Sequence, residues 1–167
     1  MSALTEIEEA VPALRRYAWS LLRQSQDADD LVHDCVIKAL DALPQRTADG
    51  AVKPWLFTIM HNLFVSRWRM ARRRAAVMVV APDAESPVEA GQEWSLATRE
   101  LVAGLDLLTP EQRDVLLLVS VEGLEYREVA AVLGIPIGTV MSRLSRARDA
   151  LRNHLEGRER QPLRRVK

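Results

Sequence analysis

Apolar residues recur every three or four positions along most of this sequence, and this helical spacing is the feature that most limits the folds open to the chain. We find no run with the two-residue period of a strand beyond the short segment 77–80, which fits a packed loop equally well. The sequence therefore predicts an all-α protein.

The spacing predicts seven helices, with three clear start signals. Asp27 is expected to cap the second helix with its carboxylate, and Pro54 to lie in the first turn of the third. Thr109, Pro110 and Gln112 form the pattern of a capping box before the fifth. The expected helices cover residues 6–23, 27–43, 54–74, 94–107, 110–122, 126–133 and 137–155.

Composition and charge divide the chain into three parts. With 167 residues, the chain has room for one ordinary domain or two small ones. Helical periodicity fails over residues 81–91, where prolines, Gly91 and acidic residues gather, so we expect two helical domains at 1–75 and 94–160 joined by a flexible linker at 76–93. The net charges of residues 1–75, 76–108 and 109–167 are +2, −5 and +3, although the whole chain is neutral. This distribution indicates two anion-facing modules, and the basic tail from Gly157 is expected to fray.

The sequence also indicates the compartment. Cys35 is the single cysteine, which excludes an intramolecular disulfide and fits a reducing environment. No apolar run approaches the roughly 18 residues of a membrane span, and the N-terminus lacks the features of a signal peptide. We expect a cytoplasmic protein without membrane insertion.

Residues 126–140 have the form of a helix-turn-helix, with a short helix, a tight turn at Gly134 and a longer helix. We expect Ala130 and Ala131 to let the helices approach closely. The expected shared core is Val129, Leu133 and Val140, and the inward stripe of the second helix is Val140, Leu144, Ala147 and Leu151.

The opposite side of that second helix presents hydroxyl and arginine side chains. Arginine can bind guanine edges with two hydrogen bonds, and hydroxyls bind bases or phosphates, so this face suits the major groove of DNA. Residues 143–167 have a local charge of +6, which adds the electrostatic attraction that DNA binding needs. An ordinary solvated helix face is the alternative interpretation of the arginines alone.

Two further helices have contrasting surfaces. Residues 67–74 contain five arginines around Trp68 and no acid, a combination that suits single-stranded nucleic acid because bases stack on the ring and phosphates bind the guanidinium groups. The alternative is that Trp68 packs on a neighbouring helix. Residues 27–41 contain five aspartates around Leu31, which could bind a basic partner protein or serve only as helix-terminal charges.

Together these segments resemble the extracytoplasmic-function class of bacterial sigma factors, the two-domain promoter-specificity subunits of RNA polymerase. Residues 27–34 are similar to the family's polymerase-binding helix, and residues 53–59 with Asn62 to the helix that recognises the −10 promoter element. Residues 108–113 and 138–148 are similar to its −35-binding domain. Met141 and Glu125 depart from the family's usual basic residue and serine, and Cys35 and His61 from an aromatic residue and an arginine.

The resemblance implies a transcription initiation factor that binds the polymerase β′ clamp helices and β flap, melts the −10 element and recognises the −35 element. It also implies a monomer controlled by an anti-sigma factor, for which residues 77–80 offer a docking strip. The implied contacts are Asp27, Asp30, Leu31, Asp34 and Lys38 for polymerase, Asn62, Arg67, Trp68, Arg69, Arg72 and Arg73 for the −10 element, and Thr139, Met141, Ser142, Arg143, Ser145, Arg146 and Arg148 for the −35 element.

Three other functions have weaker support. A helix-turn-helix repressor or activator would explain residues 110–155 but neither of the two N-terminal surfaces. A sigma-like decoy, which sequesters an anti-sigma protein and never initiates transcription, is usually attached to a receiver domain, for which we expect no room in this chain. Catalysis has no support in the pattern, because His33, His61 and His154 lie far apart and there is no metal-ligand spacing, phosphate-binding glycine loop or nucleophile elbow. We expect no catalytic residue, metal or cofactor.

Overall fold

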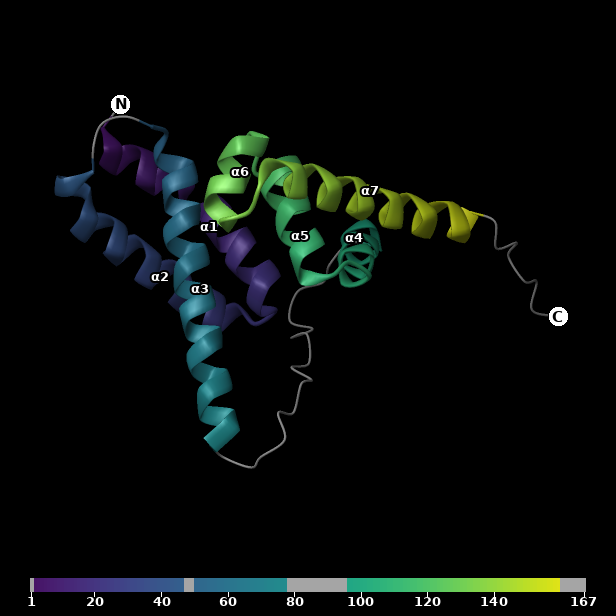
Figure 1. Ribbon diagram of the computed structural model, residues 1–167, viewed down its shortest axis with the longest axis horizontal. Coiled ribbons are helices and arrows are strands. Elements are labelled where there is room, and N and C mark those ends of the chain that lie inside the picture. Colours follow the sequence, from purple (N-terminus) through teal and green to yellow (C-terminus); the bar gives the residue numbers. More distant parts are fainter. Residues whose placement is uncertain (1, 47–49, 78–95, 160–167) are drawn as a thin grey trace. The chain divides into compact units, whose positions relative to one another are not determined.

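The computed structural model describes residues 2–46, 50–77 and 96–159, and the ordered elements in these ranges are all helical (Figure 1). The all-α prediction is thus confirmed. The chain forms two compact units, Met1–Gly91 with Ala131–Gly134 and Gln92–Ala130 with Ile135–Lys167. The elements are α1 (Ala3–Leu22), α2 (Ser25–Ala42), the 3₁₀ turn η1 (Leu43–Gln45), α3 (Val52–Val77), α4 (Leu96–Asp106), α5 (Pro110–Leu116), the π-helical turn η2 (Leu117–Val121), α6 (Tyr126–Leu133) and α7 (Ile137–Glu159).

The first unit is a bundle in which α1, α2 and α3 all pack against one another. At its centre the rings of Tyr17 and Phe57 meet edge to face with their centroids 5.4 Å apart. Edge-to-face contact is a favoured geometry for aromatic pairs and adds to the gain from burying both rings. The side chains of Leu14, Leu31, Leu56 and Met60 in the same unit are also fully buried.

The N-terminal ends of α1 and α2 differ from those predicted from the sequence. The helix α1 begins at Ala3 because the Ser2 hydroxyl accepts a hydrogen bond from the Leu4 N–H, 3.3 Å away. The cap predicted at Asp27 is wrong: α2 begins at Ser25 after Gln24, and Asp27 lies within its first turn, where its charge favours the helix dipole.

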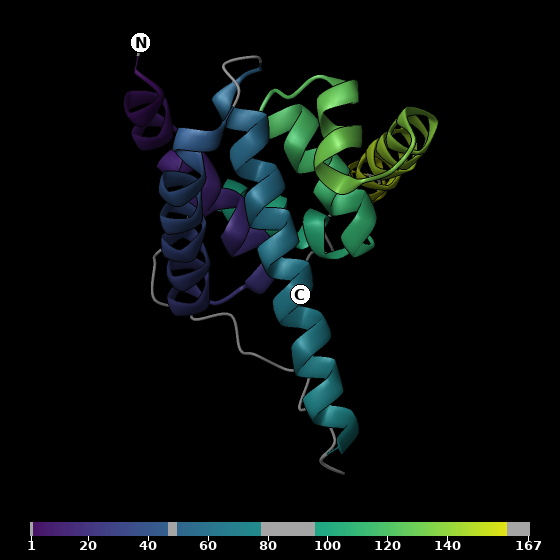
Figure 2. The ribbon, with the colours of Figure 1, turned by 60° about the vertical axis from the view of Figure 1, so that its left-hand side comes forward.

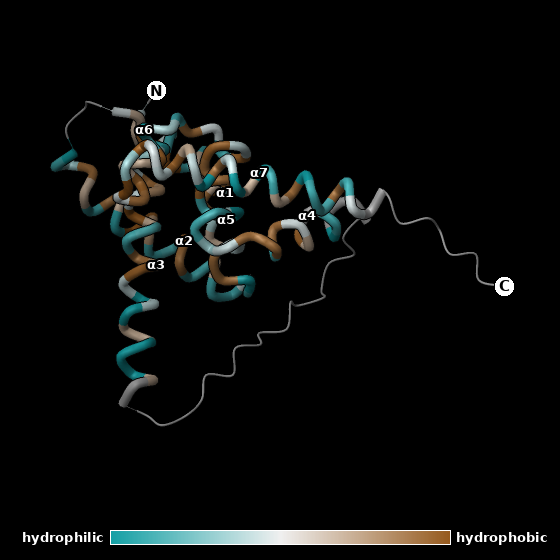
Figure 3. Tube along the Cα trace, turned by 45° about the vertical axis from the view of Figure 1, so that its right-hand side comes forward, coloured by the Kyte–Doolittle hydropathy of each residue, from teal (hydrophilic) through white to brown (hydrophobic). Residues whose placement is uncertain are grey.

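The helix α3 is the longest element and extends beyond the rest of its bundle. It begins at Val52, two residues before Pro54, and Figures 1 and 2 both show its C-terminal end running past α1 and α2. Residues 69–75 are exposed on every side of the helix, and the tube in Figure 3 is mostly hydrophilic along this stretch. Packing therefore supports only the first part of α3.

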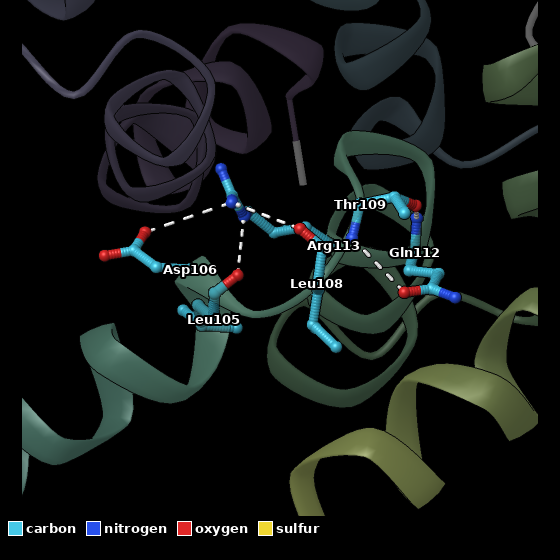
Figure 4. A network of polar contacts seen from close by, with 6 residues as sticks. All are labelled: Leu105, Asp106, Leu108, Thr109, Gln112 and Arg113. Atoms are coloured by element: carbon cyan, nitrogen blue, oxygen red, sulfur yellow. Dashed lines mark hydrogen bonds and ion pairs between the residues drawn. The ribbon is translucent and has the colours of Figure 1, made fainter. Parts of the chain in front are cut away.

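The second unit contains an ordered junction between α4 and α5 (Figure 4). The predicted capping box is confirmed: Thr109 Oγ1 accepts from the Gln112 N–H at 3.3 Å, and the Thr109 N–H donates to Gln112 Oε1 at 3.2 Å. Arg113 donates from Nε to the carbonyl oxygen of Leu105 at 3.1 Å and from its terminal nitrogen to that of Leu108 at 3.5 Å. The Leu105 carbonyl, which also accepts from the Leu108 N–H at 3.2 Å, lies in the last turn of α4, so the Arg113 side chain joins the end of α4 to α5.

The helix expected over 110–122 changes its winding halfway. Regular α5 ends at Leu116 and the π-helical turn η2 follows, with the Glu122 N–H bonded to the Leu117 carbonyl oxygen at 2.9 Å. Gly123 has a φ of +72° and permits the Leu124 N–H to reach the Leu118 carbonyl oxygen at 3.0 Å. The helix therefore ends in this wider turn.

The helix-turn-helix prediction is confirmed in its local geometry. Gly134 has a φ of +64°, and the chain bends by 103° between α6 and α7, within the roughly 90–120° of such motifs. Val129 and Val140 are fully buried as predicted, Ala130 and Leu133 are half-buried, and Ala131 is exposed, so burial does not support the close approach predicted at Ala131. The helix continues through Gly157 to Glu159, so the expected fraying at Gly157 is wrong for these residues, and 160–167 lie outside the described ranges.

The inward stripe of α7 is supported by α4 and α5. Val140, Leu144 and Ala147 are buried as predicted. Leu151 is half-buried and lies so close to Gly104 that a side-chain carbon on that glycine would be 3.0 Å from Leu151 Cδ2. One side of α7 is therefore fixed by packing, and the other side is open.

Candidate nucleic-acid interface

The projecting end of α3 presents an aromatic ring beside a guanidinium group. Trp68 is 50% exposed, so the alternative that it packs on a neighbouring helix is wrong. The Arg72 guanidinium lies over its ring, 4.7 Å from the ring centroid and one helical turn further on. This cation–π pair orients Trp68 while half of the residue's surface stays accessible. Such an arrangement could stack a nucleic-acid base and bind its phosphate.

Arg67 is engaged differently from the other arginines of this segment. Its guanidinium forms an ion pair and hydrogen bond with the Asp34 carboxylate of α2. Both side chains remain partly exposed, at 40% for Arg67 and 49% for Asp34. Two residues predicted for different partners are thus each other's partner, at the point where α3 leaves its bundle.

The remaining residues predicted for the −10 element lie on the same helix. Asn62, Arg69 and Arg73 are exposed. His61 is half-buried, and burial lowers the pKa of its imidazole below the usual value, so the ring is neutral at neutral pH. The exposed surface in this part of α3 therefore has its positive charge from arginines only.

The outer face of α2 combines acidic and apolar side chains. Asp27, Asp30 and Lys38 are exposed as predicted. Leu31 is fully buried, so its predicted contact with a partner is wrong: this side chain belongs to the core. Ile37 and Leu40 are instead exposed, at 44% and 43%, and lie three residues apart on one helix face. Neither is among the contact residues expected from the sequence, although their spacing was a usable signal.

The open side of α7 contains the residues predicted for the −35 element. Ser142, Ser145, Arg146 and Arg148 are exposed, and so is Met141 at 53%, while Thr139 is half-buried. The Ser142 hydroxyl donates to the Thr139 carbonyl oxygen at 3.1 Å. The hydroxyl proton is thereby used within the helix, and the Ser142 oxygen can still accept a hydrogen bond.

Arg143 lies at the edge of this surface, and its charge affects the carboxyl of Asp114 in α5. It is half-buried, and its charge lowers the pKa of the Asp114 carboxyl, as the charge of Arg113 also does. Burial is the larger effect and raises the pKa of Asp114 to about 7. Arg143 thus favours the charged form of this carboxyl and partly offsets the effect of its burial.

Other chemistry has little support in the described ranges. Among the residues that the structure describes, no three His, Cys, Asp or Glu side chains come together as a metal site. Cys35 is buried with its thiol 3.5 Å from the Leu56 carbonyl oxygen, and burial raises its pKa to about 12, so it stays protonated. In the same ranges no single helix is long and apolar enough to cross a membrane, although α6 and α7 meet this criterion as a bent pair.

Two sequence families match the two helical parts of the chain. Residues 7–74 match the family described as Sigma-70 region 2, and residues 98–151 match Sigma-70, region 4. The first match contains α2 and most of α3, and the second contains the capping box, α6 and most of α7. Each candidate surface therefore lies in a segment with its own sigma-factor relatives.

Relatives over most of the chain are also sigma factors. The sequence is 37% identical to the ECF RNA polymerase sigma factor EcfG of Rhodopseudomonas palustris, over 87% of this chain and 81% of that protein. It is 30% identical to the ECF RNA polymerase sigma-E factor of Escherichia coli, over 79% of this chain and 75% of that protein.

Solved structures give the same result. The sigma factor RpoE in complex with the anti-sigma factor NepR from Bartonella quintana is 33% identical, with a TM-score of 0.79 over 91% of this chain and 95% of that chain. CnrH in complex with the cytosolic domain of CnrY is 26% identical, with a TM-score of 0.66 over 93% and 88% of the two chains. From these matches and the helical surfaces described above, the chain belongs to the extracytoplasmic-function family of RNA polymerase sigma factors.

Proposed function

We propose that this chain is an alternative sigma factor that binds core RNA polymerase and directs it to specific promoters. The observation behind this proposal is that one compact unit presents both the acidic and apolar face of α2 and the Trp68–Arg72 pair of α3. A repressor or activator with a helix-turn-helix would need neither surface. Residues 1–75 would serve polymerase and the −10 element, 94–160 the −35 element, and 76–93 would link them.

Polymerase binding is assigned to the outer face of α2. Asp27, Asp30, Asp34 and Lys38 supply charge there, and Ile37 and Leu40 replace Leu31 as the apolar contacts. An acidic rim around exposed apolar residues suits a basic partner with its own apolar centre, as in typical protein interfaces. The partner would be the β′ clamp helices, while the second unit would contact the β flap.

Promoter binding is divided between two helices. Asn62, Arg67, Trp68, Arg69, Arg72 and Arg73 would bind the melted −10 element, with Trp68 as the stacking platform. Thr139, Met141, Ser142, Arg143, Ser145, Arg146 and Arg148 would bind the −35 duplex through the major groove. The chain itself would supply recognition and no catalysis, metal or cofactor, and it would act as a monomer in the cytoplasm, where core polymerase works.

The first experiment is a pull-down with bacterial core polymerase followed by run-off transcription on genomic fragments. Polymerase binding with new transcripts is the expected result and would also identify the promoter. Duplex DNA binding without polymerase binding would contradict the proposal in favour of a repressor or activator. Binding to neither polymerase nor DNA would favour a decoy that sequesters an anti-sigma protein, or a chain whose inhibitor must first be removed.

The Asp34–Arg67 pair permits a finer test of the residue assignment. If Arg67 acts only by holding Asp34, R67A has no further effect on promoter opening in a D34A background. If Arg67 also binds the −10 strand, R67A weakens single-strand binding by the D34A holoenzyme as well. We expect the second result, because 40% of the Arg67 side chain remains exposed beside Trp68.

We also propose control by an anti-sigma factor, as in the complexes of the two structural relatives. Such an inhibitor would cover the polymerase-binding face of α2. The strip 77–80 stays a prediction, since all but Val77 lie outside the described residues. Unchanged affinity of the inhibitor after deletion of 77–80 would contradict the role of the strip.

A further inference from the structure

The first turn of α7 has two exposed apolar side chains that packing does not require. Ile137 is 49% exposed and Met141 is 53% exposed. They lie four residues apart, on one face and about 6 Å apart along the helix axis. Val140, Leu144 and Ala147 are buried in the same helix, while both members of the pair keep about half of their surface accessible.

The surroundings of this pair are suited to a duplex and not to a second apolar surface. Gly138 lies between them, and a side-chain carbon placed there would meet no atom within 4 Å, so the surface is open. Ser142 follows Met141 directly, and the exposed guanidinium of Arg146 lies one turn beyond Ser142. An apolar protein partner would have to cover these polar groups, whereas a DNA major groove offers hydrogen-bond partners for them.

We propose that Ile137 and Met141 bind the C5-methyl groups of thymines in the −35 element, an inference that rests on the proposed function. Residues at the N-terminal end of a recognition helix reach the base edges, and thymine presents a methyl group in the major groove. An apolar patch about 6 Å long matches methyl groups on base pairs one or two steps apart, because base pairs are separated by about 3.4 Å. The neighbouring hydrogen bonds would come from Arg146 to guanine and from an amino group to Ser142.

The chemistry makes a prediction about the promoter. Met141 and Arg146 are five residues apart, which separates them by about 7.5 Å along the axis and by about 140° around it. A thymine, on either strand, should therefore lie within a few base pairs of the guanine that Arg146 contacts. Its methyl group, and not its hydrogen-bonding pattern, would be the feature that the protein recognises.

Deoxyuridine isolates that methyl group, because it differs from thymidine only at C5. The experiment takes the full-length chain in its holoenzyme and a −35 duplex obtained by selection from a random pool. Each thymine is then replaced singly by deoxyuridine, and binding is measured. We expect about three- to fourfold weaker binding at one or two positions, the loss that corresponds to one buried methyl group.

Variants of the chain assign the effect to the patch. M141A should weaken binding to the thymine duplex by a similar factor and show little further loss with deoxyuridine, whereas M141L should keep the discrimination. L155A is the matched control, since Leu155 is a similarly exposed apolar residue, 57% accessible, near the other end of α7. It should leave the discrimination between thymine and deoxyuridine unchanged.

Two results would overturn the inference while the proposed function stands. One is equal binding of thymine and deoxyuridine duplexes at every position when R146A still weakens binding to the same duplex. The other is full discrimination retained in an I137A/M141A double variant, which would assign the methyl effect to the DNA itself. Failure of the holoenzyme to select any −35 sequence would overturn the proposed function and this inference together.

Discussion

The end of α3 and the open side of α7 are both rich in arginine, but the two helices are supported in different ways. Val140, Leu144 and Ala147 are buried and hold one side of α7 in its unit, so the residues that we assign to the −35 element lie on a helix fixed by packing. Residues 69–75 of α3 are exposed all round, and the ion pair from Arg67 to Asp34 lies just before them. Charge composition alone does not distinguish the two surfaces.

This difference fits the two kinds of DNA that we assign to them. A duplex has a groove of fixed shape, and its recognition needs a helix held in one position. A single strand has no fixed shape and binds through stacking and phosphate contacts, which tolerate a less constrained helix end. Arg69 and Arg73 are also four residues apart, and this like-charge spacing destabilises an isolated helix by a few tenths of a kcal/mol. We expect nucleic acid to relieve that repulsion.

The largest effect should come from Arg146→Ala, which tests the open side of α7. Loss of a bidentate contact to guanine should cost about 1–3 kcal/mol of −35 duplex binding and relax specificity at one base pair. The measurement is duplex affinity of the holoenzyme for each base at that position. Arg152→Ala is the control, because Arg152 is paired with Asp149 at 3.6 Å further along the same helix. Equal losses from the two variants would indicate nonspecific electrostatics and remove the distinction between the two surfaces.

Trp68→Ala tests the end of α3, which packing does not support. It should leave polymerase binding unchanged and impair open-complex formation, since stacking of a base on an aromatic ring contributes about 1–3 kcal/mol. The measurement is transcription from duplex and from premelted promoters, with the defect expected mainly on the duplex. Met70→Ala is the matched control, because Met70 is 54% exposed on the same part of α3. Equal activity of the Trp68 variant on the two templates would contradict its role in melting.

The sequence is sufficient for the helices and the helix-turn-helix, because these depend on local spacing, capping and glycine conformation. The sequence does not determine which residues of α3 face the core. Helical spacing alone places Leu56, Ile59, Met60 and Leu63 on one inward face of α3. This face omits Phe57, which is fully buried against Tyr17. A helical pattern defines a face only to within about one residue, and the neighbouring helices decide which large side chain points inward.

The same limit explains the errors at the candidate sites. The surrounding aspartates favour a surface position for Leu31, but α2 turns it into the core and leaves Ile37 and Leu40 outside. The pair of Asp34 and Arg67 spans 33 residues, and no local pattern indicates such a contact. The π-helical turn after Leu116 likewise continues an ordinary helical pattern, so spacing does not predict it.

Burial of the Asp114 carboxyl should make the stability of the second unit depend on pH. Its folded-state pKa of about 7 lies above the ordinary value of 3.8, so the folded unit binds more protons than the unfolded chain between these values. The unfolding free energy should therefore fall as the pH rises from about 4 to about 7. Asp114→Asn should remove this dependence and raise Tm at about pH 8 by several degrees, since about 1 kcal/mol corresponds to about 4–8 °C in a small domain. If the Asp114→Asn variant keeps the pH dependence of the unaltered protein, another group is responsible for that dependence.

The smallest effect concerns the cap of α6. The Glu125 N–H donates to Glu128 Oε2 at 2.7 Å, which is half of a capping box, while the Glu125 side chain instead pairs with the exposed Arg127 at 2.9 Å. A serine at 125 could complete the box by accepting from the Glu128 N–H, a gain of about 0.5–1 kcal/mol, whereas the lost surface ion pair contributes less. Glu125→Ser should therefore raise the Tm of the second unit by a few degrees and leave single-strand binding unchanged.

The double variant E125S/E128A distinguishes this explanation from a simple change of charge. Without the Glu128 carboxylate the reciprocal bond is lost, so most of the gain in Tm should disappear if the two side chains act as one cap. If E125S and E125Q raise Tm equally, removal of a negative charge is the cause and the capping argument fails. If E125S also alters binding to single-stranded −10 DNA, the two surfaces do not depend on separate supports, and the contrast between α3 and α7 must be abandoned.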